Sequence, residues 1–304
     1  MPNTLSRLAA LSGNLQGILL MLVATSLDAV LLAAVRYLSA EIHPFELAFW
    51  RNFIGFITLT PWFLRRGLAP FRTAQLRLHL FRAVINVGGM LLFFTALSLI
   101  PMPKAQALLF TAPLFATILA VLVLGERIRL RRLSALVVGF CGALIVIRPG
   151  FQQVDAGSLM VLGCAVLWGA TMILIKYLGR LDSAVTITVY MTLLMTPLSL
   201  LPALFVWTGP SPTQLLIIAT GALAATLGQL AMAQAFRLAE MTVVMPLDFT
   251  KLIFGSILAY TLFQETIDLW GWMGAVVIFG SAFYVVYRER QVKRRLGRDH
   301  SELS

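Results

Sequence analysis

The sequence predicts an all-α membrane protein with ten transmembrane helices, arranged as two inverted five-helix repeats. Of its 304 residues, 59% are hydrophobic and 12% are charged, against roughly 45 to 50% and 25% in soluble domains. Apolar runs of about 20 residues, the length that crosses a bilayer as a helix, recur along the chain. The second half also repeats part of the first. These observations exclude a soluble globule and leave no room for a large extramembrane domain.

The predicted spans are stretches that satisfy their backbone polar groups internally as helices. In chain order they cover residues 15–35, 45–63, 79–100, 104–124, 133–147, 157–178, 184–206, 213–236, 242–263 and 269–287. Short connections join them. Any function of the chain is therefore expected within the bilayer.

The basic residues indicate the orientation, because positively charged short loops stay in the cytoplasm. With the spans alternating across the bilayer, one side carries Arg36, Lys104 and Arg148. The other side carries Arg7, Arg65, Arg66, Arg72, Arg77, Arg127, Arg129, Arg131, Arg132, Lys176, Arg180, Arg237, Arg288, Arg290, Lys293, Arg294, Arg295 and Arg298. We therefore predict a multi-pass protein of a bacterial inner membrane with both termini cytoplasmic. The formal net charge of +11 then reflects topology, and no nucleic-acid partner is expected.

An internal repeat becomes visible when the chain is compared with itself at an offset of 139 residues. Residues 96–128 share twelve identities with residues 235–267. We predict a first repeat over residues 14–148, a second over 157–288 and a basic cytoplasmic tail over 289–304. Because each unit has an odd number of spans, the second enters the membrane inverted. Inverted repeats with a site at their interface are typical of secondary transporters.

Ionisable side chains inside the spans are candidate functional residues, because each costs roughly 2.5–3.5 kcal/mol at a helix centre. Asp28 and Arg51 have similar predicted depths, so they form either a proton or anion site or a static ion pair between the first two spans. Asp248 and Lys251 share one helix face just after Pro246. This is the strongest local indication of a site. The alternative is a self-neutralised pair facing another helix.

Three further residues complete the predicted substrate-binding set. Asn86 extends the polar lining or forms an interhelical hydrogen bond. Trp168 and Tyr190 stack on a flat ligand or simply pack between helices. Glu46 and Arg82 lie near span ends, where we expect solvent around the first and lipid phosphate contact for the second.

Other chemistry is not indicated by the sequence. Cys141 and Cys164 both fall in apolar spans, where a thiol behaves as a small hydrophobe. Nothing resembles a phosphate loop, a Ser/His/Asp set or a zinc signature. We therefore expect no disulfide, no catalytic residue, no metal site and no cofactor, and the chain is not predicted to be an enzyme.

The two halves share a pattern: a Pro-containing span, then an acidic residue, Glu126 or Glu265, and then a Gly-rich last span. This pattern resembles the EamA-type ten-helix branch of the drug/metabolite transporter superfamily over about residues 14–288. Residues 45–51 are similar to the family's second span and residues 244–249 to its ninth. The resemblance implies transport of small organic solutes by alternating access through a central cavity, without nucleotide hydrolysis.

The predicted function is a secondary transporter of a small organic metabolite, with riboflavin as one candidate substrate. Members similar in composition include riboflavin and S-adenosylmethionine importers, so S-adenosylmethionine or an amino-acid-like metabolite is the alternative. A membrane enzyme acting on lipid-linked substrates would need catalytic groups beside a large loop, whereas the loops here are short. A receptor or scaffold is a third hypothesis. The expected partners are a solute and the lipid bilayer, and the sequence leaves a homo-oligomer open.

In one departure from the repeat, Gln264 stands where the first half has Gly125.

Overall fold

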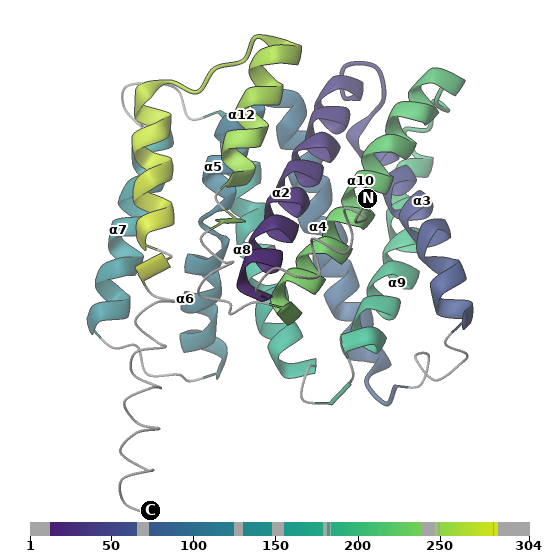
Figure 1. The fold of residues 1–304 in the computed structure, drawn as a ribbon, viewed down its shortest axis with the longest axis horizontal. Coiled ribbons are helices and arrows are strands. Elements are labelled where there is room, and N and C mark those ends of the chain that lie inside the picture. Colours follow the sequence, from purple (N-terminus) through teal and green to yellow (C-terminus); the bar gives the residue numbers. More distant parts are fainter. Residues whose placement is uncertain are drawn as a thin grey trace, which may run out of the picture.

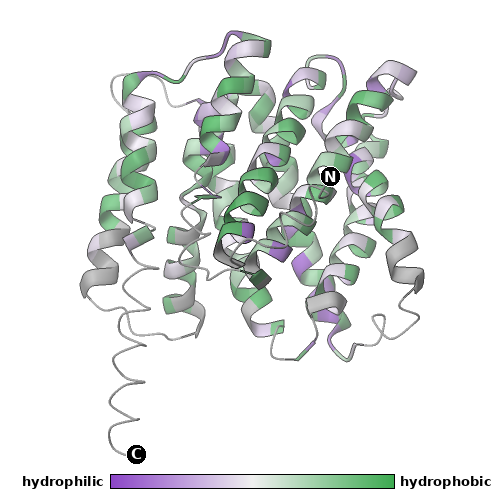
Figure 2. Cartoon of the chain, in the orientation of Figure 1, coloured by the Kyte–Doolittle hydropathy of each residue, from purple (hydrophilic) through white to green (hydrophobic). Residues whose placement is uncertain are grey.

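The computed structural model describes residues 13–65, 73–124, 130–147, 155–178, 181–182, 184–238, 247–248, 250–281 and 283–284. Throughout these residues the regular structure is helical, without strands. Long helices stand side by side in one bundle (Figure 1). Hydrophobic residues cover much of their length (Figure 2).

The helices follow the predicted spans closely in most of the described chain. The first half contains α2 (Gly13–Leu38), α3 (Pro44–Arg65), α4 (Leu76–Leu99), α5 (Met102–Leu109), α6 (Ala112–Leu124) and α7 (Leu130–Ile147). The second half contains α8 (Ala156–Leu178), α9 (Ala184–Leu204), α10 (Pro212–Leu238), α12 (Thr250–Phe263) and a helix at Leu269–Ser281, called the last helix below. The predicted tail, Glu126 and Pro246 lie outside the described residues.

Several of these helices are long and apolar enough to cross a bilayer. Six such stretches occur in the described chain: Leu15–Leu38, Leu76–Leu99, Met102–Leu119, Ala156–Ile175, Thr186–Leu204 and Pro212–Ala235. Shorter apolar helices are Val137–Ile147, Thr250–Phe263 and Leu269–Ser281. Large apolar side chains such as Leu122 and Leu216 point outward. Such a surface suits hydrocarbon rather than water.

The predicted span 104–124 is not one helix. α5 ends at Leu109, and both the backbone N–H and the Oγ1 of Thr111 donate to the Leu108 carbonyl, at 3.0 and 2.7 Å. In the second half, Thr250 Oγ1 donates to the Leu247 carbonyl at 2.6 Å. Thr250 and Leu247 are the partners of Thr111 and Leu108 at the offset of 139. A threonine bond of the same kind therefore lies between α5 and α6 and at the start of α12.

The helices of the two halves are interleaved. α2 packs along α10 and against α12, while α8 packs along α4 and against α6; α3 contacts α9. Glycine permits close approach at these crossings. A Cβ added at Gly169 of α8 would lie 2.8 Å from the Ala116 nitrogen of α6, and one at Gly228 of α10 would lie 3.2 Å from the Ala24 carbonyl oxygen of α2.

Ion pairs between the halves lie at both ends of the bundle. At one end, Arg36 pairs with Glu265, and Lys104 Nζ lies 2.7 Å from Asp155 Oδ2. At the other end, His79 Nε2 lies 2.8 Å from Asp182 Oδ2. α2 therefore finishes at the Arg36 end, where α8 begins, so these two helices run in opposite directions (Figure 1).

The turn after α12 keeps a geometry that usually requires glycine. Gln264 has a φ of 56°, in the left-handed region. The Gln264 N–H donates to Tyr260 O and the Glu265 N–H to Ala259 O, each at 3.1 Å. These bonds close the helix as a glycine at this position normally does. Gln264, the departure from the repeat, therefore still forms a tight turn that delivers Glu265 to Arg36.

Candidate functional site

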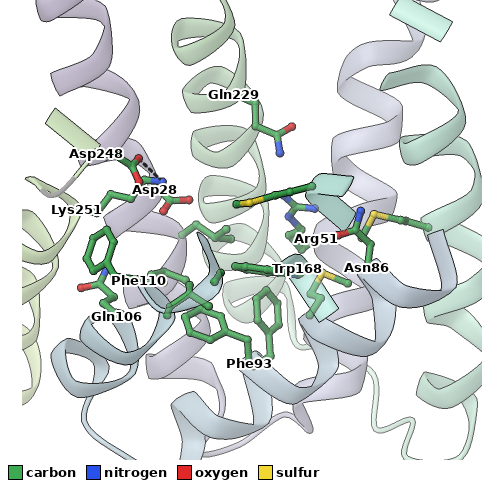
Figure 3. Close-up of a pocket in the computed structure, with 18 of the residues that line it drawn as sticks. Asp28, Arg51, Asn86, Phe93, Gln106, Phe110, Trp168, Gln229, Asp248 and Lys251 are labelled. Carbon is green, nitrogen blue, oxygen red and sulfur yellow. Dashed lines mark ion pairs between the residues drawn. The ribbon is translucent and has the colours of Figure 1, made fainter. Parts of the chain in front are cut away.

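A cavity of about 320 Å³ lies between the two halves (Figure 3). Helices α2 to α6 and α8, α9, α10 and α12 all contribute to its wall, together with Phe110 and Asp248. It is lined by Asp28, Leu31, Leu32, Arg51, Asn86, Met90, Phe93, Phe94, Gln106, Leu109, Phe110, Ala112, Trp168, Met172, Met191, Met195, Gln229, Asp248 and Lys251. Its size falls within the range of small-molecule sites, roughly 300–1,000 Å³.

An acid–base cluster occupies one side of the cavity. Lys251 Nζ lies 2.6 Å from Asp248 Oδ1, and Asp28 of α2 faces the same pair (Figure 3). Carboxylates from both halves thus lie near one ammonium group, which pairs with that of Asp248. The proximity of Asp248 and Lys251, predicted from their spacing, is observed. Among the described residues, Lys251 and Asp248 form a salt bridge in this cavity. Asp28 and Arg51, for which a static ion pair was one prediction, form none there.

Arg51 and Asn86 form a second polar group across the cavity (Figure 3). One guanidinium nitrogen of Arg51 donates to Asn52 Oδ1 at 2.9 Å, and Asn52 Nδ2 donates to Ser199 Oγ at 3.1 Å. The Asn52 and Ser199 side chains thus connect Arg51 to α9. Because a guanidinium carries five N–H donors, Arg51 retains donors for an anionic or carbonyl group of a ligand.

Aromatic rings form an apolar surface between these polar groups. Phe93 and Trp168 lie with ring centroids 5.7 Å apart and planes inclined by 47°. Gly89 makes room for Trp168, since a Cβ at this position would lie 2.8 Å from the indole Nε1. Phe110 continues the surface towards the acid–base cluster (Figure 3). A flat ring with polar substituents at both ends suits such a lining.

Six of the seven predicted substrate-binding residues line this cavity. They are Asp28, Arg51, Asn86, Trp168, Asp248 and Lys251. Tyr190 is not among the lining residues. Its ring stacks on His79, with centroids 4.8 Å apart and planes inclined by 22°. The predicted role of Tyr190 in substrate binding therefore has no support from this cavity.

Two expectations for span ends were wrong. Glu46 is fully buried, and its carboxylate accepts hydrogen bonds from Thr208 N, Thr208 Oγ1 and Gly209 N. Arg82 is 1% exposed and donates to the Ile187 carbonyl at 2.7 Å. The connection between α9 and α10 supplies the partners of Glu46 in place of solvent, and α9 supplies the partner of Arg82 in place of lipid phosphate.

The sequence pattern did not identify every polar group of the cavity. Gln106 of α5 is 4% exposed and lines the cavity, and neither atom of its amide has a hydrogen-bond partner. Its signal was a neutral polar residue in an apolar span, four positions before Phe110. That signal is weak, because an amide in a span usually bonds to another helix.

The EamA-like transporter family matches residues 15–148 and again residues 155–287. The chain belongs to the EamA-like transporter family.

Relatives of this EamA-like transporter have named functions. It is 33% identical over 287 residues to a riboflavin transporter of Vibrio cholerae, covering 92% of this chain and 96% of the relative. It is 28% identical over 285 residues to an S-adenosylmethionine uptake transporter of Rickettsia prowazekii, covering 93% and 96%. The apolar helices and the family show that this EamA-like transporter is a multi-pass membrane protein. The similarity to these relatives shows that it transports small metabolites. The family and these relatives are transporters rather than enzymes.

A solved crystal structure has the same fold. The two align with a TM-score of 0.60 at 17% sequence identity, covering 91% of this EamA-like transporter and 98% of the other chain. The similarity extends over nearly the whole chain and therefore includes both sides of the cavity. At this level of identity it describes the fold alone.

Proposed function

We propose that this transporter carries riboflavin across a bacterial inner membrane. The observation that carries the proposal is the lining of the cavity: an aromatic surface of Phe93, Trp168 and Phe110 between two polar groups (Figure 3). The flavin ring is flat and apolar on its faces, with hydrogen-bonding groups along one edge and on the ribityl chain. Arg51 and Asn86 supply donors at one end of the cavity, and the acid–base cluster supplies donors and acceptors at the other.

Transport is proposed to occur by alternating access between two inverted repeats, residues 14–148 and 157–288. The opposite directions of α2 and α8 support the inversion. The packing also supports the inversion, because the first helix of each repeat packs on the third helix of the other: α2 on α10, and α8 on α4. The equivalent bonds of Thr111 and Thr250 give further support. If the halves exchange conformations, the same cavity opens first to one side and then to the other.

The bundle is proposed to point its Arg36 end outward and its His79 end to the cytoplasm. The asymmetry of basic loops supports this orientation, because the loops rich in arginine connect the spans at the His79 end. Both termini and the basic tail at residues 289–304 are then cytoplasmic. The Arg36–Glu265 and Lys104–Asp155 pairs lie at the outer boundary.

S-adenosylmethionine is the second candidate substrate. The observation that favours it is the presence of two carboxylates, Asp28 and Asp248, opposite the guanidinium of Arg51. A sulfonium and an α-ammonium group suit carboxylates, and an α-carboxylate suits a guanidinium. The aromatic surface accommodates an adenine ring as it does a flavin.

Flux into proteoliposomes tests these proposals directly. Purified protein is reconstituted, and entry of radiolabelled riboflavin and of radiolabelled S-adenosylmethionine is measured against protein-free vesicles. Saturable riboflavin entry that unlabelled S-adenosylmethionine does not inhibit is the expected result. Entry of S-adenosylmethionine alone would reassign the substrate, and entry of neither would remove both proposals. Repeating the assay with an imposed pH or sodium gradient identifies the coupling ion.

A further inference from the structure

The cavity contains a buried polar group that the proposed function does not yet use. Gln106 is 4% exposed, and both its Nε2 and its Oε1 lack a hydrogen-bond partner. Leaving a buried donor or acceptor unpaired costs about 1–3 kcal/mol for each group. A leucine of similar size would avoid that cost in this conformation. The amide is therefore expensive unless another state of the transporter gives it partners.

The packing around Gln106 restricts where a partner can come from. A Cβ added at Gly255 of α12 would lie 2.0 Å from Gln106 Oε1 and 2.6 Å from Nε2. The glycine thus provides the space in which the amide rests, and α12 closes that side. The opposite side is the cavity, where Gln106 is a lining residue beneath Phe110 (Figure 3). The χ1 and χ2 torsions of a glutamine have several staggered minima, so a change of rotamer can turn the amide towards the cavity without movement of α5.

We propose that the Gln106 amide forms hydrogen bonds with the edge of the transported ring and so determines substrate specificity. A glutamine amide presents one acceptor and one NH₂ donor side by side. Its complement is a flat heteroaromatic ring that carries a donor next to an acceptor. The imide edge of a flavin and the N6–N7 edge of adenine both have this arrangement, and glutamine pairs with adenine in this way elsewhere. Phe110 and Trp168 would hold such a ring by its faces while Gln106 binds its edge.

This inference rests on the proposed function and explains how one cavity suits two candidate substrates. The flavin and the adenine differ in shape and charge beyond the ring, where Arg51 and the acid–base cluster lie. They share the donor–acceptor edge. A ring without that edge leaves the amide buried and unpaired, and sites of this kind reject such analogues strongly.

The test compares each substrate with an analogue methylated on that edge. In proteoliposomes, riboflavin and N3-methylriboflavin compete for entry, and S-adenosylmethionine competes with its N6-dimethyl analogue. Wild-type protein is expected to prefer the unmethylated form of whichever substrate it carries by roughly tenfold to a hundredfold. In Gln106→Leu, and in Gln106→Met as a second variant, this ratio falls towards one. Gln214→Leu, which removes an amide outside the cavity, keeps the wild-type ratio.

The outcomes separate this inference from the function on which it rests. A structural role for Gln106 would change entry of the two forms equally and leave the ratio intact, which would overturn the inference while riboflavin transport stands. A wild-type protein that carries neither substrate overturns both. Folding is checked by the unfolding temperature in detergent, where Gln106→Leu is expected to equal or exceed wild type because it removes an unpaired buried amide.

Discussion

Arg36 and Glu265, separated by 229 positions in the chain, bind each other at one end of the bundle. Arg36 Nε donates to Glu265 Oε1 at 2.8 Å, while Glu265 Oε2 accepts the backbone N–H of Met102 at 2.9 Å. Arg36 also donates to the Leu97 carbonyl at 2.7 Å. One ion pair and its neighbouring hydrogen bonds therefore join α2, α4, α5 and the turn after α12, and they link the two halves at one end of the bundle.

Removing this ion pair is expected to destabilise the protein. Arg36→Leu and Glu265→Leu each leave a partly buried charged partner unpaired and lower the free energy of unfolding by about 1–3 kcal/mol. The double variant should lose less than the sum, with a coupling energy of roughly 0.5–3 kcal/mol. Unfolding by SDS in mixed micelles measures all three. Additive losses would show that the two side chains do not stabilise the fold through each other.

The acid–base cluster is expected to be required for transport as a balanced set. Lys251→Met leaves Asp28 and Asp248 in the same cavity without the cation beside them, and the rate of riboflavin entry should fall at least tenfold. Adding Asp248→Asn to Lys251→Met removes one of the two uncompensated charges and should restore part of the rate, because breaking an ion pair costs more than deleting it. Entry is measured per amount of reconstituted protein. A Lys251→Met protein with the wild-type rate would remove the cluster from the proposed binding site.

The loop before α8 is expected to make stability depend on pH. Asp155 Oδ1 accepts the Ser158 N–H at 2.6 Å, and Oδ2 lies 2.7 Å from Lys104 Nζ. Partial burial raises the pKa of Asp155, but the hydrogen bonds from Lys104 and Ser158 and the charge of Lys104 outweigh it, so the pKa lies below its usual value. Because the folded-state pKa is the lower one, this stabilisation is complete above the unfolded value of about 3.9. It is lost as the pH falls through the folded-state pKa.

The measurement for Asp155 is the unfolding temperature in detergent between pH 6 and pH 3. Wild type should lose more of its unfolding temperature over this range than Asp155→Asn, which keeps a helix-capping side chain but does not titrate. Ser158→Ala, which removes the Oγ hydrogen bond to Asp155 Oδ2 at 3.0 Å, should lie between them. Equal slopes for wild type and Asp155→Asn would assign the pH dependence to other groups.

The helical architecture could be predicted from the sequence. Backbone N–H and C=O groups without hydrogen bonds are too costly in hydrocarbon, so each span must be a helix, and it appears in the sequence as a long apolar run. The interruption at Thr111 could not be predicted in this way. A threonine inside an apolar run leaves hydropathy almost unchanged, so hydropathy gave no signal for the hydroxyl and N–H bonds of Thr111 to the Leu108 carbonyl where α5 ends. The internal repeat did mark this position, since Thr111 is identical to Thr250 at the offset of 139 residues.

Cavity residues could be predicted from the sequence when burying their side chains in a membrane has a high free-energy cost. Asp28, Asp248 and Lys251 could be selected from the sequence because a charge within a span is tolerated only in a cavity or a pair. Phe110 gave no such signal, since an aromatic ring is equally stable against a neighbouring helix. Tyr190 illustrates the same ambiguity: the orientation of α9 places its ring on His79, away from the cavity lining.

The contact between α7 and the last helix depends on two glycines. A Cβ at Gly142 would lie 2.9 Å from the Gly274 carbonyl oxygen, and a Cβ at Gly274 would lie 2.6 Å from the Gly142 carbonyl oxygen. Backbone atoms cannot yield as side chains do, so Gly142→Ala and Gly274→Ala must push the helices apart. We expect each to lower the free energy of unfolding by about 1–3 kcal/mol.

Gly280 of the same last helix is the matched control, because a Cβ at Gly280 would meet nothing within 4 Å. Gly280→Ala should be neutral, or stabilising by up to about 1 kcal/mol through the higher helix propensity of alanine. SDS unfolding of the three alanine variants compares them directly. If Gly142→Ala and Gly274→Ala were as stable as Gly280→Ala, the close approach of the two helices would not contribute to the fold, and the glycines would need another explanation.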